Sequence, residues 1–126
     1  MMKEVITTSD GPKAIGPYSQ AVKANGFVFV SGQVAIDPVT NTLLSGDVGF
    51  QTDRVLKNVV GILQAAGTSL DKVVRSTVFL KNMNDFVAMN EVYGRYFQTA
   101  APARSTVEVA RLPKDVLVEI DVIALA

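Results

Sequence analysis

The sequence predicts an α+β fold in which two helices cover one face of one sheet. Apolar residues recur three or four positions apart in two segments, which is typical of amphipathic helices. Runs rich in β-branched and aromatic residues precede, separate and follow these segments, which predicts strands. Two helices suffice to cover one sheet face. The chain has 126 residues, near the common size of one domain, so residues 1–126 are expected to form a single domain.

The N-terminal third predicts a short strand followed by a hairpin. A strand near Val5 leads into a loop that is rich in turn-forming residues. Residues 21–24 and 27–30 are β-like and flank Asn25-Gly26. Asn-Gly between two such runs predicts a tight hairpin, because both turn positions need a positive φ.

The two helices are expected at residues 48–66 and at about residues 85–97. Asp47 is the expected N-cap of the first helix, and Gly67 follows its last turn. Asn84 is the expected N-cap of the second helix. The remaining strands are expected at residues 73–80, 103–109 and 117–124.

Several of these strands are apolar on both faces, including residues 27–30 and 117–124. The two helices can cover only one face, so the other face needs a different cover. We expect a second subunit to supply it. The alternative is an open sheet with an apolar solvent-facing side, which would promote aggregation.

The composition excludes several classes of function. Lys plus Arg and Asp plus Glu each number 12, which gives no electrostatic footprint for nucleic acid or an anionic membrane. The chain has no Cys and no His. It therefore forms no disulfide and lacks the usual zinc ligands, a thiol nucleophile and an imidazole base. The sequence contains no signal-peptide core and no membrane-spanning stretch, so we expect a cytoplasmic protein.

Two charged residues interrupt the C-terminal strands. Arg104 begins one strand, and Glu119 breaks the apolar run of the other, with Asp121 on the same face by alternation. A carboxylate in such a run is unfavourable unless it is paired. We expect Arg104 and Glu119 to meet, either as a structural ion pair or as an anion-binding fork beside a carboxylate that can handle a water. Asp121 is expected at a rim or an interface.

Three further positions also depart from their surroundings. Asn90 lies on the apolar face of the second helix, between Phe86 and Tyr93, where it either contacts a ligand or caps a loop. Ser31-Gly32 interrupts an apolar strand, which predicts a bulge with or without a nearby ligand. Tyr18 lies in a Gly-Pro loop, where it either serves a site or forms a lid over the core.

Several segments of the chain carry a family resemblance. They are Ile15-Gly16-Pro17-Tyr18-Ser19-Gln20-Ala21, Ser31-Gly32-Gln33, Thr77-Val78-Phe79-Leu80 with Asp85-Phe86, and the long stretch from Pro102-Ala103-Arg104-Ser105 to Lys114-Asp115, followed by Val118-Glu119-Ile120. Together they resemble the RidA (YjgF) family of reactive-intermediate deaminases. The resemblance covers nearly the whole chain.

The resemblance implies a chorismate-mutase-like mixed sheet and a homotrimer with a central barrel, helices outside and sites between subunits. It implies cofactor-free and metal-free hydrolysis of small anionic imines and enamines, such as 2-iminobutanoate, 2-iminopropanoate and 2-aminoacrylate, to 2-keto acids and ammonia. Arg104 would bind the substrate carboxylate, and Glu119 would lie beside the attacking water. The other implied pocket residues are Tyr18, Ser31, Gly32, Asn90 and Thr106.

Thr106 departs from the family pattern, because many members have Cys at this position. A thiol role is therefore absent here, which leaves room for a different substrate preference but does not require the chemistry to fail. Two other functions remain open at this point. One is a keto-acid-binding regulatory protein without turnover. The other is an RNA-cleaving translation inhibitor, which the balanced charge argues against.

Overall fold

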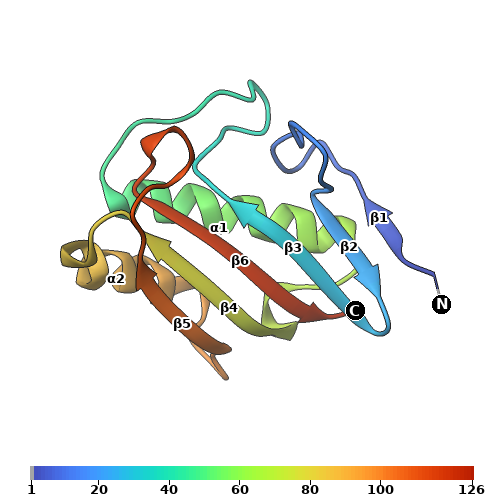
Figure 1. The fold of residues 1–126 in the computed structure, drawn as a ribbon. Coiled ribbons are helices and arrows are strands. Elements are labelled where there is room, and N and C mark those ends of the chain that lie inside the picture. The colour runs from blue at the N-terminus through green and yellow to red at the C-terminus, as the bar shows by residue number, and fades with distance from the viewer. Residues whose placement is uncertain (1) are drawn as a thin grey trace.

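The computed structural model describes residues 2–126, which form one mixed six-stranded sheet with two helices on one face (Figure 1). The strand order is β1-β2-β3-β6-β4-β5, and only the β4–β5 pair is parallel. This confirms the predicted α+β fold. The elements are β1 (Glu4–Ile6), β2 (Ala21–Ala24), β3 (Phe27–Gln33), α1 (Val48–Ala65), β4 (Val73–Leu80), α2 (Phe86–Tyr96), β5 (Ala103–Glu108) and β6 (Val118–Leu125), with short 3₁₀ turns at Leu70–Lys72, Met83–Asp85 and Pro113–Asp115.

The β2–β3 hairpin and the ends of α1 form as expected from local sequence. Asn25 and Gly26 have φ values of 53° and 83°, which the tight hairpin turn requires. The Asp47 carboxylate accepts a hydrogen bond of 2.8 Å from the Phe50 N–H and caps α1. Gly67 has a φ of 83° just beyond the other end.

The prediction that Asn84 caps the second helix is wrong. The helix begins at Phe86, after the 3₁₀ turn Met83–Asp85. The cap of that turn is Asn82, whose side-chain oxygen accepts a hydrogen bond of 2.9 Å from the Asn84 N–H. The capping residue therefore lies two positions earlier, because an extra turn precedes the helix.

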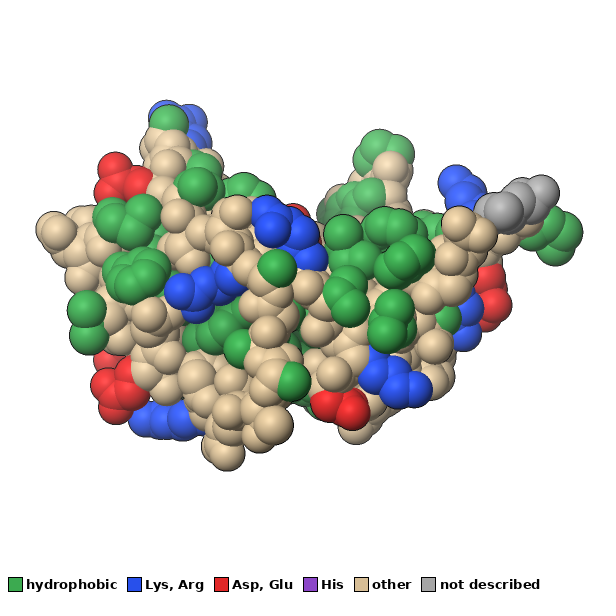
Figure 2. Space-filling view, turned by 90° about the horizontal axis from the view of Figure 1, so that it is seen from below, with side chains coloured by type: hydrophobic (Ala, Val, Ile, Leu, Met, Phe, Trp, Pro, Cys, Tyr) green, Lys and Arg blue, Asp and Glu red, His purple; other side chains and the backbone are tan. Residues whose placement is uncertain are grey.

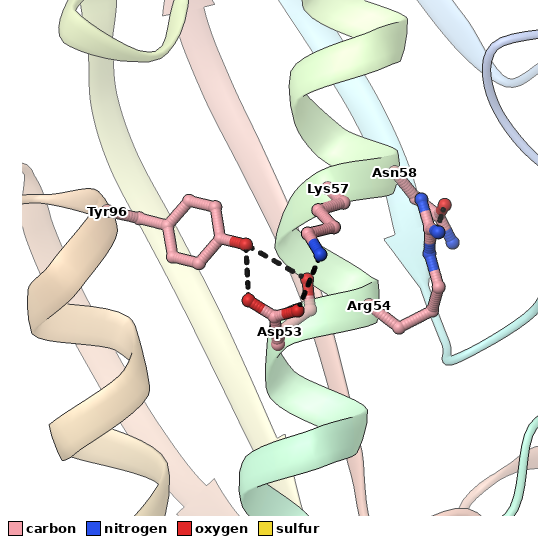
Figure 3. A network of polar contacts seen from close by, with 5 residues as sticks. All are labelled: Asp53, Arg54, Lys57, Asn58 and Tyr96. Carbon is pink, nitrogen blue, oxygen red and sulfur yellow. Dashed lines mark hydrogen bonds and ion pairs between the residues drawn. The ribbon is translucent and has the colours of Figure 1, made fainter.

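A polar network fastens the two helices to each other and to the loop after β3 (Figure 3). The Tyr96 hydroxyl of α2 lies 2.6 Å from a carboxylate oxygen of Asp53 on α1, and Lys57 pairs with the same carboxylate at 3.0 Å. Arg54 donates to Asn58, whose amide donates to the Ile36 carbonyl at 2.9 Å. These bonds hold α2 in a defined position behind β4 and β5.

The sheet face away from the helices is rich in exposed apolar side chains. Phe27, Phe29 and Leu125 on β3 and β6 are 37%, 44% and 45% exposed, and Val107 on β5 is also exposed. Figure 2 shows hydrophobic side chains in several exposed groups on the side that it views, with acidic and basic groups scattered among them. The helices therefore cover only one face, and we refer to the other as the open face.

Candidate active site

Arg104 is held by three side chains of one helix. It lies on the edge strand β5, and its guanidinium donates a hydrogen bond of 2.7 Å to the Asn90 side-chain oxygen. The guanidinium carbon lies 4.7 Å from the centre of the Tyr93 ring and 5.6 Å from that of Phe86. Phe86, Asn90 and Tyr93 are four and three residues apart on α2, which places them on one helix face. Asn90 thus binds Arg104 rather than capping a loop.

The guanidinium retains capacity for an anion. It carries five N–H donors in a planar fork, and within residues 2–126 the structure gives it one hydrogen-bond acceptor, Asn90. Arg104 is half-buried, so an anion placed against it would be partly shielded from water. This cluster of Arg104, Asn90, Phe86 and Tyr93 is called the arginine cluster below.

Glu119 lies over a bulge in the neighbouring strand. Ser31 and Gly32 interrupt the β3–β6 register, which shifts between Val30 and Gln33. A Cβ atom at Gly32 would lie 2.9 Å from the Glu119 carboxyl carbon and closer still to one of its oxygens. The predicted bulge is confirmed, and a larger residue at position 32 would displace the Glu119 carboxylate from its present place.

Burial raises the pKa of Glu119 above that of an ordinary glutamate, and the nearby Asp121 carboxylate raises it further. Burial also raises the pKa of Asp121, although the Thr77 hydroxyl and the Arg75 guanidinium act against this shift. Glu119 makes no ion pair within the described chain. Its protonated form therefore persists to higher pH than usual, which suits a group that accepts and returns a proton.

The expectation that Arg104 and Glu119 meet is wrong for a single chain. Arg104 is the register partner of the buried Ser76, whereas Glu119 pairs with Phe79, three residues further along β4. Register partners share a face and alternate residues point oppositely, so Arg104 lies on the helix side and Glu119 on the open face. The strand β4 also separates β5 from β6. One chain thus presents two separate half-sites.

Tyr18 and Ser31 lie in the N-terminal part of the fold. Ser31 donates a hydrogen bond of 2.6 Å to the Ser19 carbonyl, which ties the bulge to the loop that carries Tyr18. Tyr18 is 53% exposed and accepts a hydrogen bond from the Ile15 N–H at 3.3 Å, so it is not a lid over the core. It lines a groove of about 420 Å³ whose other walls include Thr8, Lys13, Ser19, Gln20 and Asn41.

Thr106 lies on the same face of β5 as Arg104, two residues further along. Its hydroxyl oxygen is buried and has no hydrogen-bond partner within residues 2–126. An unpaired buried hydroxyl costs roughly 1–3 kcal/mol. The Thr106 hydroxyl is therefore a buried polar group without a hydrogen-bond partner, two residues along β5 from Arg104.

Comparison with known proteins assigns the chain to a family. Residues 8–126 match the family model described as Endoribonuclease L-PSP. A RutC family protein of Pyrococcus horikoshii is 58% identical over 123 residues, or 98% of each chain. The 2-iminobutanoate/2-iminopropanoate deaminase of Mus musculus is 46% identical over 125 residues, which cover 99% of this chain and 93% of the mouse protein. The chain belongs to the RidA (YjgF) family.

The family fold is also matched by a solved structure. One match is the crystal structure of E. coli TdcF with bound serine, whose sequence is 44% identical to this chain. The two structures superpose with a TM-score of 0.92, and the match covers 98% of each chain. The chorismate-mutase-like arrangement expected from the RidA resemblance is thus confirmed for the subunit. No helix among residues 2–126 combines the length and apolar character needed to cross a bilayer. Those residues also contain no group of acidic side chains arranged to hold a metal.

Sequence reasoning missed two kinds of residue in this RidA-family chain. Phe86 and Tyr93 were expected to form only the buried face of the second helix, yet both lie against Arg104. Their spacing from Asn90, four residues before it and three after it, places all three side chains on one helix face, and this spacing was the sequence feature that could have indicated the contact. Gln20 was not singled out at all. It is 4% exposed, and its amide donates to the carbonyls of Thr8, Gly11 and Pro12, which shapes the groove beside Tyr18.

Proposed function

We propose that this RidA-family chain is a cofactor-independent deaminase that hydrolyses 2-imino acids and their enamine tautomers to 2-keto acids and ammonia. The observation that carries the proposal is the arginine cluster, in which a half-buried guanidinium bonds to one acceptor, Asn90, among residues 2–126. Such a fork matches a carboxylate. The mouse relative named 2-iminobutanoate/2-iminopropanoate deaminase and the serine-bound TdcF structure support a small substrate that carries a carboxylate.

The proposed reaction needs only groups that the chain contains. Arg104 binds the carboxylate of the 2-imino acid and leaves the C=N carbon open to water. Glu119 takes a proton from the attacking water, and oxygen bonds to that carbon to give a carbinolamine. Glu119 returns this proton to the nitrogen, which completes the neutral carbinolamine. Glu119 then takes the proton of the new hydroxyl and passes it to the nitrogen, the C–N bond breaks, and ammonia leaves as the C=O bond forms. The net change consumes one water and yields one keto acid and one ammonia.

We further propose that each complete site combines two subunits of a homotrimer. Arg104 and Glu119 lie on opposite faces of one sheet, so one chain cannot bring them to the same substrate. A second copy seated on the open face could bring its edge strand β5, and with it Arg104, toward Glu119 of the first. The exposed phenylalanines of that face supply apolar area for such an interface. Tyr18, Ser31, Gly32 and Thr106 would line the resulting pocket.

The trimer is directly measurable. Light scattering on the purified protein is expected to give about three times the chain mass of 13.5 kDa. Phe29→Lys places a charge on the open face, and it should shift the protein toward the monomer because a buried unpaired charge is costly. A wild-type protein that stays monomeric and monodisperse at micromolar concentration would contradict the proposal.

Turnover is tested in a coupled assay in which a PLP-dependent serine dehydratase releases 2-aminoacrylate. The protein is expected to accelerate the appearance of ammonia and pyruvate beyond the spontaneous rate. A protein that binds pyruvate without accelerating ammonia release would instead be a keto-acid-binding regulator. Both measurements are therefore made on the same preparation.

The family description names a ribonuclease, but the surface offers little support for RNA binding. The chain carries no net charge, and acidic and basic side chains are interspersed on the face shown in Figure 2. RNA binding relies on clustered cations and exposed stacking aromatics. The imine deaminase is therefore the function that we propose.

A further inference from the structure

We propose that Tyr93, anchored by Ser76, is a positioning residue that fixes the plane of the Arg104 guanidinium for the substrate carboxylate. The inference rests on the proposed function, because it gives the guanidinium a carboxylate partner. It adds a role for two residues that would otherwise belong only to the core.

The contacts around Arg104 restrict the guanidinium in two ways. The Tyr93 ring, 4.7 Å from the guanidinium carbon, provides a surface on which the planar group can lie. The hydrogen bond from one terminal nitrogen to Asn90 limits rotation within that plane. A guanidinium stacked on a ring keeps its in-plane N–H groups free for a carboxylate. The ring thus orients the fork without using its donors.

Tyr93 is itself held firmly. Its side chain is 6% exposed, and its ring lies 4.6 Å from the ring of Phe97. Its hydroxyl lies 2.6 Å from the hydroxyl of Ser76, which is fully buried. Ser76 is the register partner of Arg104 on the adjacent strand. The anchor of the ring and the backbone of the arginine therefore lie side by side.

A packing role alone does not account for the hydroxyl pair. Phenylalanine and alanine would fill this space, and replacing both partners of a buried hydrogen bond by apolar groups is often nearly neutral for stability. The hydroxyl pair instead prevents the Tyr93 ring from sliding relative to β4. The ring that this pair ties to β4 is the ring over which the Arg104 guanidinium lies.

The test compares Tyr93→Leu with Tyr96→Leu, a matched control on the same helix whose hydroxyl bonds to Asp53 of α1 rather than to Ser76. Calorimetry measures the affinity for 2-oxobutanoate, and nitrogen-15 NMR measures rotation of the Arg104 guanidinium about its Nε–Cζ bond in ligand-free protein. Tyr93→Leu is expected to weaken binding about tenfold and to speed this rotation. Tyr96→Leu is expected to change neither.

Tyr93→Phe keeps the ring and removes only the bond to Ser76. It is expected to speed guanidinium rotation with a smaller loss of affinity than Tyr93→Leu, and it decides the question if the leucine variant does not fold. Unchanged rotation in the folded Tyr93 variants would overturn the proposal, as would equal weakening by Tyr96→Leu. If the wild type binds no keto acid, the proposed function fails, whereas the ligand-free rotation measurement still decides whether Tyr93 positions Arg104.

Discussion

Glu119→Gln is expected to lower imine turnover by about 10²–10⁴-fold, the usual contribution of a general base. Gln matches Glu in shape and can still hydrogen-bond a water, but it cannot take the proton that the water loses as it attacks. Affinity for 2-oxobutanoate and the oligomeric state should be retained. The measurement pairs kcat in the coupled dehydratase assay with calorimetric binding of the keto acid.

The same variant separates a chemical role from a scaffolding role. If Glu119 served mainly as a buried counter-ion, its neutralisation should cost roughly 3–5 kcal/mol of stability and weaken keto-acid binding in proportion. A large fall in melting temperature with parallel loss of binding would therefore assign Glu119 to the scaffold. Glu119 makes no ion pair among residues 2–126, so contacts inside one chain give no reason for such a fall.

The pH dependence of stability has a definite sign. The pKa of Glu119 is raised in the folded chain by burial and by Asp121. The stability linked to this group is fully present below the ordinary glutamate pKa and is lost as pH rises through the raised value. Gln carries no charge at any pH. The melting temperature of Glu119→Gln should thus equal that of the wild type in acid. It should exceed that of the wild type by a growing margin as pH rises from the ordinary to the raised pKa, and by a constant margin above it.

Arg104→Lys is expected to weaken binding of the substrate carboxylate by roughly 1–3 kcal/mol, the scale of a charge-assisted hydrogen bond. Lysine keeps the charge, but it loses the planar fork, the fixed contact with Asn90 and the stacking on Tyr93. The loss should appear in kcat/KM for the imine and in the dissociation constant of 2-oxobutanoate.

Arg111→Lys provides the matched control, because Arg111 is exposed in the loop before the last strand. It should leave both constants unchanged. Kinetics of Arg104→Lys that are indistinguishable from the wild type would remove Arg104 from the site. They would also remove the main support for a substrate that carries a carboxylate.

Local chemistry explains why much of the fold was predictable. The Asn25-Gly26 turn and the Asp47 cap depend on residues within a few positions of one another, so short patterns indicate them. Whether Arg104 and Glu119 meet depends instead on strand order. Alternation places Glu119 and Asp121 on one face of their own strand, but it cannot show that β4 lies between β5 and β6.

The role of Tyr93 was hidden for a related reason. A helical stripe of aromatic residues has the same spacing whether it packs against the core or against a charged side chain from a distant strand. Only the register between β4 and β5 brings Ser76 beside Arg104 and makes the stripe part of the arginine cluster. The unpaired Thr106 hydroxyl likewise had no signature in the sequence, because its burial depends on tertiary packing.

The position of β6 in the sheet has a consequence for how the protein is made. This strand is synthesised after all the others, yet it lies between β3 and β4 at the centre of the sheet. While the chain emerges from the ribosome, the β1–β2–β3 meander and the β4–α2–β5 unit have no shared strand to join them. Their facing edges stay unpaired until the last strand emerges, and unpaired edges are prone to wrong partners. Folding is therefore completed only after translation has passed residue 125.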